Sequence, residues 1–565
     1  MENREDSFLK RIRLVFYLII FLLALIFVRL ILIQVVERPN FLAELSPQID
    51  TQYDTIKAER GDILDRNGRY LAVSRTFFQL DVNPSFLSSA EKGILKNDLP
   101  KILGVTSSYV NKLLSETQYT LVSSSLTNEQ KSKIEQLGIA NGISFTKVVK
   151  RTYPLGDYSS TILGAVGLDG NGLSGAELYF ESYLQGLNGR VFRDFTSTKP
   201  LLPGETSFSV QPVKGDNVTL TIDSNVQYEV QNLLEDKVKE VSAKRGLAMV
   251  MDVHSGEILA LANYPTFDPT SLAGFSNATN MAVNYNYEPG SVIKPIVAAI
   301  ALENGTLHTD DSFYCSGSIR VKDRVINCWQ KHGEEHGLNE IMKNSCDVAF
   351  VQIGLKLGKE KLLEGFKSFG FGEPTGIELP SEEKGIIQDV NNVGDVELAN
   401  MSFGQGIAVT PLQLISAFQA IANKGVQLKP TIVKSIKDSN GNMVFQSKPL
   451  VERSVVSEET ASKVMDSLRA VVQDGGVPQA KISGYVVAGK TGTAQKVLPS
   501  GGYSSQKLIY SFCGLLPGDN PEFAVLVVLD ETPNPTYSLN LTAPLFKQIG
   551  DYLIRYERIE KSTPQ

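Results

Sequence analysis

The sequence predicts an α+β protein with a single N-terminal transmembrane helix and two folded domains. Strand patterns at both ends of residues 216–559, with helical patterns between them, favour a central antiparallel sheet flanked by helices. Residues 45–215 combine a hairpin signal with short polar helices, which indicates a second α+β domain. Residues 14–36 are almost entirely apolar and long enough to cross a bilayer, which takes about 20 residues.

Three basic residues, Lys10, Arg11 and Arg13, precede the apolar segment and predict that the tail, residues 1–13, is cytoplasmic. The rest of the chain is then expected outside the cytoplasmic membrane. Arg29 lies towards one end of the segment, where a long side chain can reach the membrane surface. A cleaved signal peptide is the alternative, but the apolar run is longer than that of a signal peptide and no small-residue cleavage site follows it.

The composition is that of an ordinary globular protein, with 42% hydrophobic and 21% charged residues. A net charge of −7 gives no indication of a nucleic-acid partner. The four cysteines form no Cys-x-x-Cys pair, so no metal and no cofactor are predicted. His332 and His336 lie four residues apart, but a glycine after each of them argues against a helix, and a polar loop is the favoured interpretation.

The first domain begins with a strong hairpin signal, Asn67-Gly68, between apolar stretches. Residues 87–140 have the pattern of short polar helices, and residues 155–178 are rich in turns. No cluster of titratable residues stands out in this domain. A structural role is therefore expected for it.

In the second domain, residues 218–222 alternate as a strand does, and Asp223 or Ser224 caps the helix that follows. Further strands are expected over 247–253, 257–262, 484–494, 508–516 and 522–530, with a closing helix over 543–559. In the helical middle, Thr410 and Gln413 form a predicted capping box, which we assign to the scaffold.

A serine and a lysine stand three residues apart where the central helix of this domain begins. Pro289-Gly290 mark a turn, Ser291 follows it, and an apolar helix comes next. Residues three apart at a helix start share a face, so a neutral Lys294 amine can take the proton of the Ser291 hydroxyl and make it a nucleophile. Alone, this pair is weak evidence, because a capping serine and a solvated lysine can have the same spacing.

Two further motifs follow in order, Ser345-Cys346-Asp347 and Lys490-Thr491-Gly492. With the first pair they match the Ser-x-x-Lys, Ser-Asp-Asn and Lys-Thr-Gly set of penicillin-binding proteins and serine β-lactamases, the second in a variant form. Residues 60–72 match Arg-Gly-x-Ile-x-Asp-Arg-x-Gly-x-x-Leu-Ala, the first pedestal motif of one such family. The chain therefore resembles a class B penicillin-binding protein, a monofunctional peptidoglycan D,D-transpeptidase. The resemblance implies a pedestal (dimerisation) domain at 45–215 and a transpeptidase domain at 216–559.

The resemblance also implies roles for the motif residues. Ser291 would be the acylated nucleophile and Lys294 its base, with the nucleophile helix behind the Lys-Thr-Gly strand. A lysine serves as a base only where burial or another cation lowers its pKa, and Lys490 would be that cation as well as the group that binds the substrate carboxylate. Ser345 would pass a proton to the leaving amine.

The donor peptide would bind along the Lys-Thr-Gly strand, to Thr491, Gly492 and Thr493. Gly492 has no side chain, so the peptide could lie against this strand edge. The backbone N–H groups of Ser291 and Thr493 would form the oxyanion hole.

Asp347 stands where most family members have asparagine. An ionised aspartate only accepts hydrogen bonds, and by pairing with Lys294 it would favour the protonated amine. Some elongation-type members look similar at this position, whereas Tyr287-Glu-Pro-Gly-Ser and the segment from Lys490 to Ser504 look more like division-type or sporulation-type enzymes. We favour the division type and keep the others as alternatives.

The implied activity is the cross-linking of peptidoglycan stem peptides, carried on a lipid-linked precursor polymer, through a serine acyl-enzyme that β-lactams block. The enzyme is expected in the cytoplasmic membrane and to need a membrane glycosyltransferase as partner. A serine β-lactamase and a non-catalytic β-lactam receptor or scaffold are the alternatives. A β-lactamase would not need the pedestal, and the acids that could deacylate it lie in a Gly/Pro-rich turn: Glu373, Glu378, Glu382 and Glu383.

The cysteines are less informative. Cys346 is expected to be a small buried side chain, and Cys513 lies in a predicted strand. Cys315 and Cys328 flank a loop on the predicted outer side of the membrane, and similar pairs occur in the family. A disulfide between them is left open.

Overall fold

The computed structural model describes residues 22–23, 25–27, 53–192, 209–498 and 501–562. The predicted tail and nearly all of the predicted anchor, residues 14–36, lie outside these ranges, so the anchor stays a prediction. Within the described ranges, no helix combines the length and the apolar character that crossing a membrane requires. Contacts divide the chain into two units, Met1–Ala58 with Leu187–Val213 and Glu59–Gly186 with Lys214–Gln565.

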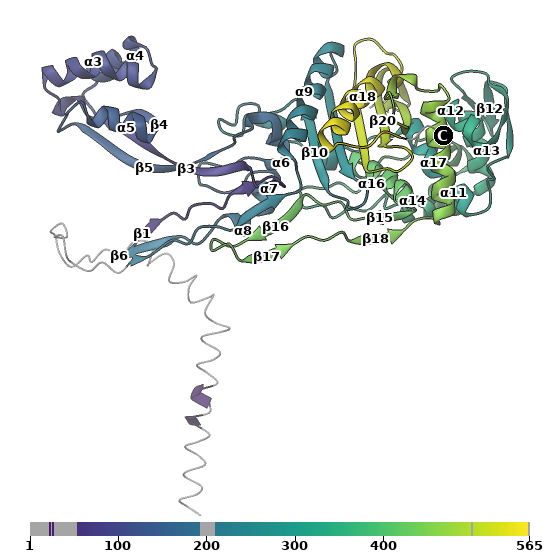
Figure 1. Ribbon diagram of the computed structural model, residues 1–565, viewed down its shortest axis with the longest axis horizontal. Coiled ribbons are helices and arrows are strands. Elements are labelled where there is room, and N and C mark those ends of the chain that lie inside the picture. Colours follow the sequence, from purple (N-terminus) through teal and green to yellow (C-terminus); the bar gives the residue numbers. More distant parts are fainter. Residues whose placement is uncertain (1–21, 24, 28–52, 193–208, 499–500, 563–565) are drawn as a thin grey trace, which may run out of the picture. The chain divides into compact units, whose positions relative to one another are not determined.

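The smaller unit contains a three-stranded antiparallel sheet (Figure 1). Its strands are β1 (Tyr53–Ile56), β6 (Gly189–Phe192) and β7 (Ser209–Val210). An additional bridge joins Leu187 to Val213. The sheet thus brings together the two ends of the segment that the sequence assigns to the pedestal.

The predicted hairpin at Asn67-Gly68 is present in the larger unit. The N–H of Asp65 donates to the carbonyl of Arg69 at 2.8 Å, and Gly68 has a φ of +83°, which glycine adopts without strain. The hairpin joins β2 (Ile63–Leu64) to β3 (Tyr70–Val82), and β3 also pairs with β4 (Thr120–Leu126) and β5 (Ile143–Thr152). Helices α3 (Ser89–Leu103), α4 (Ser107–Ser115) and α5 (Asn128–Glu135) confirm the short helices predicted in this region. Strand β4 was not predicted, because its run of serines gives no apolar alternation, and only Val122 and Leu126 in it are buried.

The strand predicted at 218–222 exists as β8 (Asn217–Leu220), but it joins the sheet of the first domain. It pairs in parallel with β2 and antiparallel with β16 (Val433–Lys437), which pairs in turn with β17 (Met443–Gln446). The sheet order is β17-β16-β8-β2-β3-β4, with β5 on β3. Both edges of β8 are occupied in this way, so one sheet continues across the predicted domain boundary at residue 215.

A buried ion-pair cluster joins distant segments of this unit. The Glu177 side chain is completely buried, and its two carboxylate oxygens accept hydrogen bonds from Nε of Arg60 at 2.6 Å and Nε of Arg151 at 2.7 Å. Arg60 also binds Glu181 at 2.7 Å. The short helices α6 (Ser160–Leu163), α7 (Gly175–Tyr179) and α8 (Glu181–Leu184) lie in this region. The prediction that the first domain holds no titratable cluster is therefore wrong, since residues so far apart in sequence leave no local pattern.

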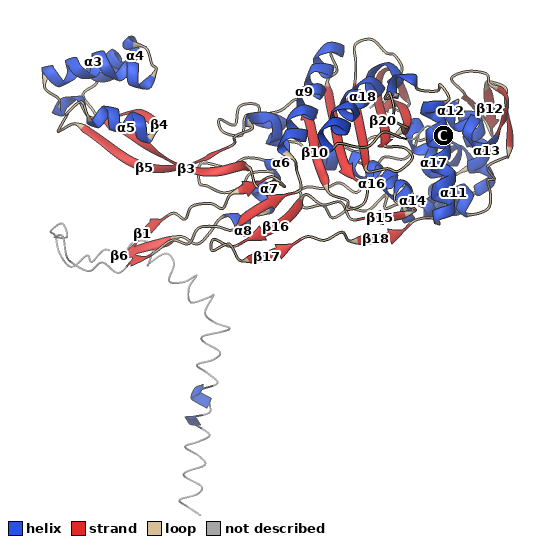
Figure 2. Cartoon of the chain, in the orientation of Figure 1, coloured by secondary structure: helices blue, strands red, loops and turns tan. Residues whose placement is uncertain are grey.

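The central antiparallel sheet predicted for the second domain is present in the described part of the chain (Figure 2). Its order is β10 (Ile258–Tyr264), β9 (Arg245–Asp252), β21 (Phe523–Asp530), β20 (Tyr503–Leu516) and β19 (Ala488–Val497). Every position of β21 is buried, so helices cover both faces of the sheet. Helix α9 (Ser224–Val241), which Asp223 caps, packs against the closing helix α18 (Ser538–Glu557), and α16 (Pro411–Ala422) packs against β21 and β20. Strand β19 ends the sheet, and among the described strands only β20 pairs with it.

The predicted helical region lies between the early and the late strands of this sheet. Besides α16, its helices are α10 (Met281–Asn284), α11 (Lys294–Glu303), α12 (Gly337–Lys343), α13 (Asp347–Leu357), α14 (Lys359–Ser368), α15 (Asp395–Met401) and α17 (Glu458–Gln473). Its short strands are β11 (Ser312–Cys315) with β14 (Gly333–His336), β12 (Ser318–Val321) with β13 (Arg324–Asn327), and β15 (Val426–Leu428) with β18 (Val451–Ser454). The capping box of Thr410 and Gln413 is confirmed. The polar loop predicted at residues 332–336 is wrong, because β14 pairs there with β11.

We expect the buried ion-pair cluster to contribute strongly to stability. Glu177→Ala leaves Arg60 and Arg151 without their shared carboxylate, and removing one partner of a buried pair costs about 3–5 kcal/mol. Urea unfolding of the full-length protein, followed by circular dichroism, should have a clearly lower midpoint. The matched control, Glu129→Ala, removes an exposed pair to Lys133 of the same 2.6 Å length and should leave the midpoint unchanged. Equal midpoints for the two variants would contradict this prediction.

Candidate active site

Ser291 lies in a 3₁₀ turn, η5 (Gly290–Ile293), which continues directly into α11. Gly290 has a φ of +61°, and its N–H donates to the carbonyl of Gly404 at 3.0 Å, which fixes the start of the turn. A proline at 295 suits the first turn of α11, where N–H groups have no partner inside the helix. Ser291 is half-buried while the residues that follow it are buried, so its hydroxyl is at the accessible end of an otherwise enclosed helix.

Lys294 is completely buried and is held by the second motif. Its Nζ lies 2.7 Å from Oδ1 of Asp347, 3.2 Å from Oγ of Ser345 and 2.6 Å from the Ser345 carbonyl oxygen. It also lies 5.4 Å from the centre of the Phe350 ring. A buried amine needs such polar partners, and the structure supplies them from one short segment.

Ser345 connects the three motifs. Its Oγ lies between two lysines, 3.2 Å from Nζ of Lys294 and 2.9 Å from Nζ of Lys490. Its backbone has a φ of +52°, a left-handed conformation that costs a non-glycine residue about 1–3 kcal/mol. Helices α12 and α13 hold it there from both sides. The hydroxyl is thus placed where it can pass a proton from one amine to the other.

Lys490 lies on β19 and is almost completely buried. Burial and the positive charge of Lys294 lower the pKa of Lys490 to about 7, although Asp347 opposes this shift. Near neutral pH, Lys490 is therefore divided between a charged form that can bind a carboxylate and a neutral form that can accept a proton.

The close contact between β19 and η5 explains Gly492. A Cβ atom at this position would lie 2.7 Å from the carbonyl oxygen of Pro289 and 2.5 Å from Oγ of Ser511. The nucleophile turn thus packs directly against the Lys-Thr-Gly strand, as the sequence predicts. The sequence predicts a glycine here to make room for the substrate. In the structure, Pro289 and Ser511 occupy the space that a side chain would need. Substrate binding by Gly492 stays a prediction.

Thr491 is half-buried, and Thr493 is exposed on the same strand. Oγ1 of Thr493 lies 2.7 Å from Oγ of Ser538, the first residue of α18, and the Ser538 hydroxyl also donates to the carbonyl of Gly492. Ser538 was missed because it belongs to no motif and follows β19 only after two further strands. The predicted roles of Thr491 and Thr493 on the substrate, and the oxyanion hole, stay predictions.

Glu288 connects three segments that lie far apart in the sequence. One carboxylate oxygen accepts a hydrogen bond from the N–H of Gly406 at 2.9 Å and another from the hydroxyl of Tyr503 at 3.2 Å. Burial raises the pKa of Glu288, although these two bonds oppose the shift. The residue thus joins the nucleophile turn to the segment before α16 and to the start of β20.

Sequence comparison relates this chain to known proteins. A family model described as "Penicillin binding protein transpeptidase domain" matches residues 246–551, and one described as "Penicillin-binding Protein dimerisation domain" matches residues 55–220. Stage V sporulation protein D of Bacillus subtilis is 36% identical over 84% of this chain and 74% of its own length. Peptidoglycan D,D-transpeptidase FtsI of Buchnera aphidicola is 28% identical over 96% of this chain and 94% of its own length.

A similar fold occurs in a crystal structure of penicillin-binding protein 3 from Mycobacterium tuberculosis in complex with aztreonam. The TM-score is 0.70 with 27% identity, and the match covers 90% of this chain and 99% of that chain. The likeness thus extends well beyond the catalytic motifs.

The lowered pKa of Lys490 predicts how acylation depends on pH. Lys490 is charged below about pH 7 and neutral above it, so a carboxylate-bearing penicillin loses its cationic partner as the pH rises. The second-order rate of acylation, which reports groups of the free enzyme, should therefore fall between about pH 6 and about pH 9. Lys490→Arg keeps the charge over this range and should remove the fall. A wild-type rate that stays level or rises across the range would show that the charge of Lys490 is not required.

Proposed function

We propose the biological role of this chain from the premise that it belongs to the class B penicillin-binding proteins. It is a serine-type peptidoglycan D,D-transpeptidase, which cross-links stem peptides and is acylated by β-lactams. One observation carries the assignment of its site. Three motifs far apart in sequence meet at the Ser345 hydroxyl, within hydrogen-bond reach of both Lys294 and Lys490.

In the proposed reaction, Ser291 attacks the carbonyl carbon of the penultimate D-alanine of a donor peptide. Lys294 takes the proton of the Ser291 hydroxyl, and the bond to the terminal D-alanine breaks. Ser345, between its two lysines, passes a proton to the departing amine. The amine of an acceptor peptide then attacks the ester, forms the cross-link and gives its proton back through the same groups. Lys490 binds the terminal carboxylate of the donor.

The acidic residues between the second and third motifs support a transpeptidase rather than a β-lactamase. Glu378 accepts hydrogen bonds from Thr431 and from the N–H of Ile432, both at 3.0 Å, and Glu382 binds the backbone and side chain of Thr375. Glu373 accepts a long hydrogen bond from Arg453 at 3.5 Å, and Glu383 accepts one from Asn286 at 3.3 Å. Within the described ranges, none of the four bonds to Lys294, Ser345 or Lys490. They serve local structure, so they do not supply a base for deacylation.

We expect a fluorescent penicillin to label the full-length protein in detergent at Ser291, with a bond that lasts many minutes. A transpeptidase excludes water and waits for an amine, which favours a long-lived acyl-enzyme. Mass spectrometry should detect the adduct on the peptide that contains Ser291. Ser291→Ala should lose it, whereas Ser132→Ala, at an exposed serine of α5, should retain it. Labelling that survives Ser291→Ala, or several turnovers of a chromogenic cephalosporin per second, would overturn the proposal.

The membrane arrangement is part of the same proposal. The basic residues before the apolar segment 14–36 support a single-pass anchor with the catalytic domain outside the cytoplasmic membrane. Cross-linking consumes glycan strands that carry stem peptides, so we propose a membrane glycosyltransferase as the partner that supplies them. The two family models, at 55–220 and 246–551, support the proposed division into a pedestal of 45–215 and a transpeptidase domain of 216–559.

Among the possible cell-wall roles we propose septum formation, in division or sporulation. The relatives reported above include a sporulation protein and an FtsI transpeptidase, which favours this role over elongation. A fluorescent fusion that replaces the native protein should concentrate at septa. Signal spread evenly along the side wall throughout growth would favour the elongation role instead.

A further inference from the structure

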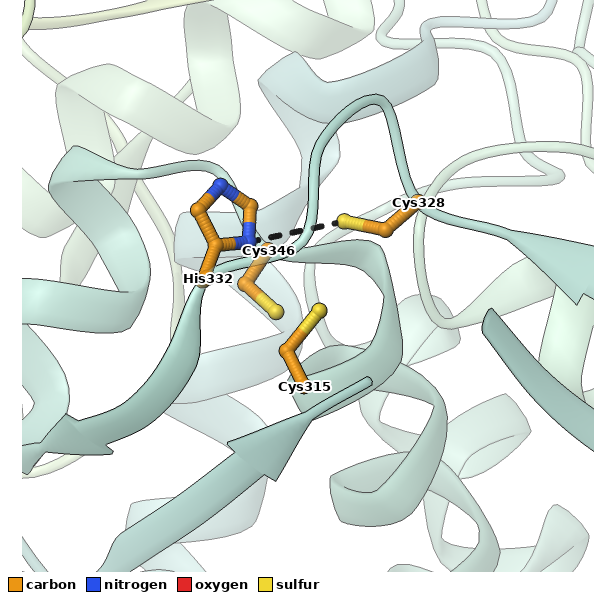
Figure 3. Close-up of side chains that lie close together, drawn as sticks. All are labelled: Cys315, Cys328, His332 and Cys346. Atoms are coloured by element: carbon orange, nitrogen blue, oxygen red, sulfur yellow. Dashed lines mark hydrogen bonds between the residues drawn. The ribbon is translucent and has the colours of Figure 1, made fainter. Parts of the chain in front are cut away.

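Three cysteines and one histidine meet beside the second motif, although they are spread over four segments. Cys315 ends β11, Cys328 follows β13, His332 precedes β14, and Cys346 caps α13. One side-chain sulfur or ring nitrogen from each lies within 4.8 Å of those of the other three. Figure 3 shows the sulfur atoms and the imidazole ring gathered around one space.

Two of the side-chain contacts of this group are long, and one ring nitrogen has no partner. Sγ of Cys328 lies 3.7 Å from Nδ1 of His332, and Sγ of Cys315 lies 3.7 Å from the carbonyl of Gln330, which are long contacts. Within the described part of the chain, the buried Nε2 of His332 has no hydrogen-bond partner, and all the cysteines are free thiols. Cys315 and Cys346 belong to the hydrophobic core and Cys328 packs against it, but packing does not account for a buried imidazole nitrogen without a partner beside them.

We propose that Cys315, Cys328, His332 and Cys346 bind a zinc ion. Three sulfur ligands and one imidazole form a common tetrahedral zinc set, and a Zn–S bond of about 2.3 Å puts ligand atoms about 3.5–3.8 Å apart. The 3.7 Å separation of Cys328 and His332 already fits this geometry. No two of the ligand atoms are more than 4.8 Å apart, so binding requires movements of at most about 1 Å, which side-chain rotation supplies.

Backbone N–H groups at the start of α13 donate to two of the sulfur atoms. The N–H of Asp347 donates to Sγ of Cys328 at 3.3 Å, and the N–H of Ala349 donates to Sγ of Cys346 at 3.4 Å. Both donors belong to the first turn of α13, where the helix dipole also stabilises negative charge. Such outer contacts orient the ligands of a metal site.

The proposed ion has a structural role. All four positions of the tetrahedron are taken by protein ligands, so none is open to substrate. Cys346 stands between Ser345 and Asp347, and Cys328 accepts a bond from Asp347, so the metal would hold the strained second motif against Lys294.

The prediction from sequence that the chain binds no metal missed this group because its spacing follows no known motif. His332 and His336, which lie four residues apart in the sequence, have different surroundings in the structure. His336 lies on the exposed side of β14, with its Nδ1 3.1 Å from Oγ of Ser312, and only His332 joins the cysteines.

Metal analysis of the full-length protein, purified in detergent without chelator and dialysed after incubation with zinc, tests the proposal. We expect elemental mass spectrometry to find one zinc per chain in the wild-type protein. The variants Cys328→Ser and His332→Gln should lose this zinc. The matched controls are His336→Gln and Cys513→Ala, which change the same residue types outside the cluster and should keep it. Wild-type protein without stoichiometric zinc, or equal loss in His332→Gln and His336→Gln, would overturn the proposal.

Cobalt replacement of the zinc in the wild-type protein gives a second readout that does not depend on how the variants fold. Thiolate-to-cobalt charge-transfer absorption and intense tetrahedral visible bands are expected. Cobalt spectra without thiolate bands would contradict the ligand set. Peptide mapping completes the test, because a disulfide between any two of these cysteines in protein isolated without reductant would show that the thiols pair with each other instead of binding zinc.

Discussion

The catalytic domain depends on the burial of two lysines beside one aspartate. Lys294 and Lys490 both lose nearly all contact with water, and the positive charge of Lys294 raises the cost of charge on Lys490. The Asp347 carboxylate lies 2.7 Å from Lys294 and offsets the cost of burying that amine. The Ser345 hydroxyl lies within hydrogen-bond distance of both lysines. Such a cluster is favourable only when every member is in place, so the helix start, the second motif and the edge strand have to be positioned together.

This requirement explains why Asp347 is compatible with catalysis. From the sequence, we expect the Asp347 carboxylate to favour the protonated form of Lys294, which cannot act as a base. The structure shows a second buried amine at the same site, Lys490, with a pKa lowered to about 7, and the Ser345 hydroxyl connects it to Lys294, so an amine that can be neutral lies beside the Lys294–Asp347 pair.

The strain at Ser345 and the packing of the nucleophile turn both bring the three motifs together in one site. A φ of +52° at Ser345 directs its hydroxyl between the lysines, and α12 and α13 hold that conformation. At Gly492, the missing side chain lets η5 approach β19 closely enough for Ser291 and the Lys-Thr-Gly strand to share one site. The cysteine cluster lies directly next to the strained residue, where a fixed backbone matters most.

The sequence by itself determined the α+β class, the central sheet of the transpeptidase domain and the motif residues, because local periodicity and short motifs are written in consecutive positions. The helix cap at Asp223 and the capping box at Thr410 are of the same kind. Tertiary structure alone decided which distant side chains meet. It brought Glu177 between two arginines, assigned β8 to the first sheet and placed Ser538 against Thr493. It also gathered three cysteines and His332. These contacts depend on how the chain folds back on itself, and no local pattern records them.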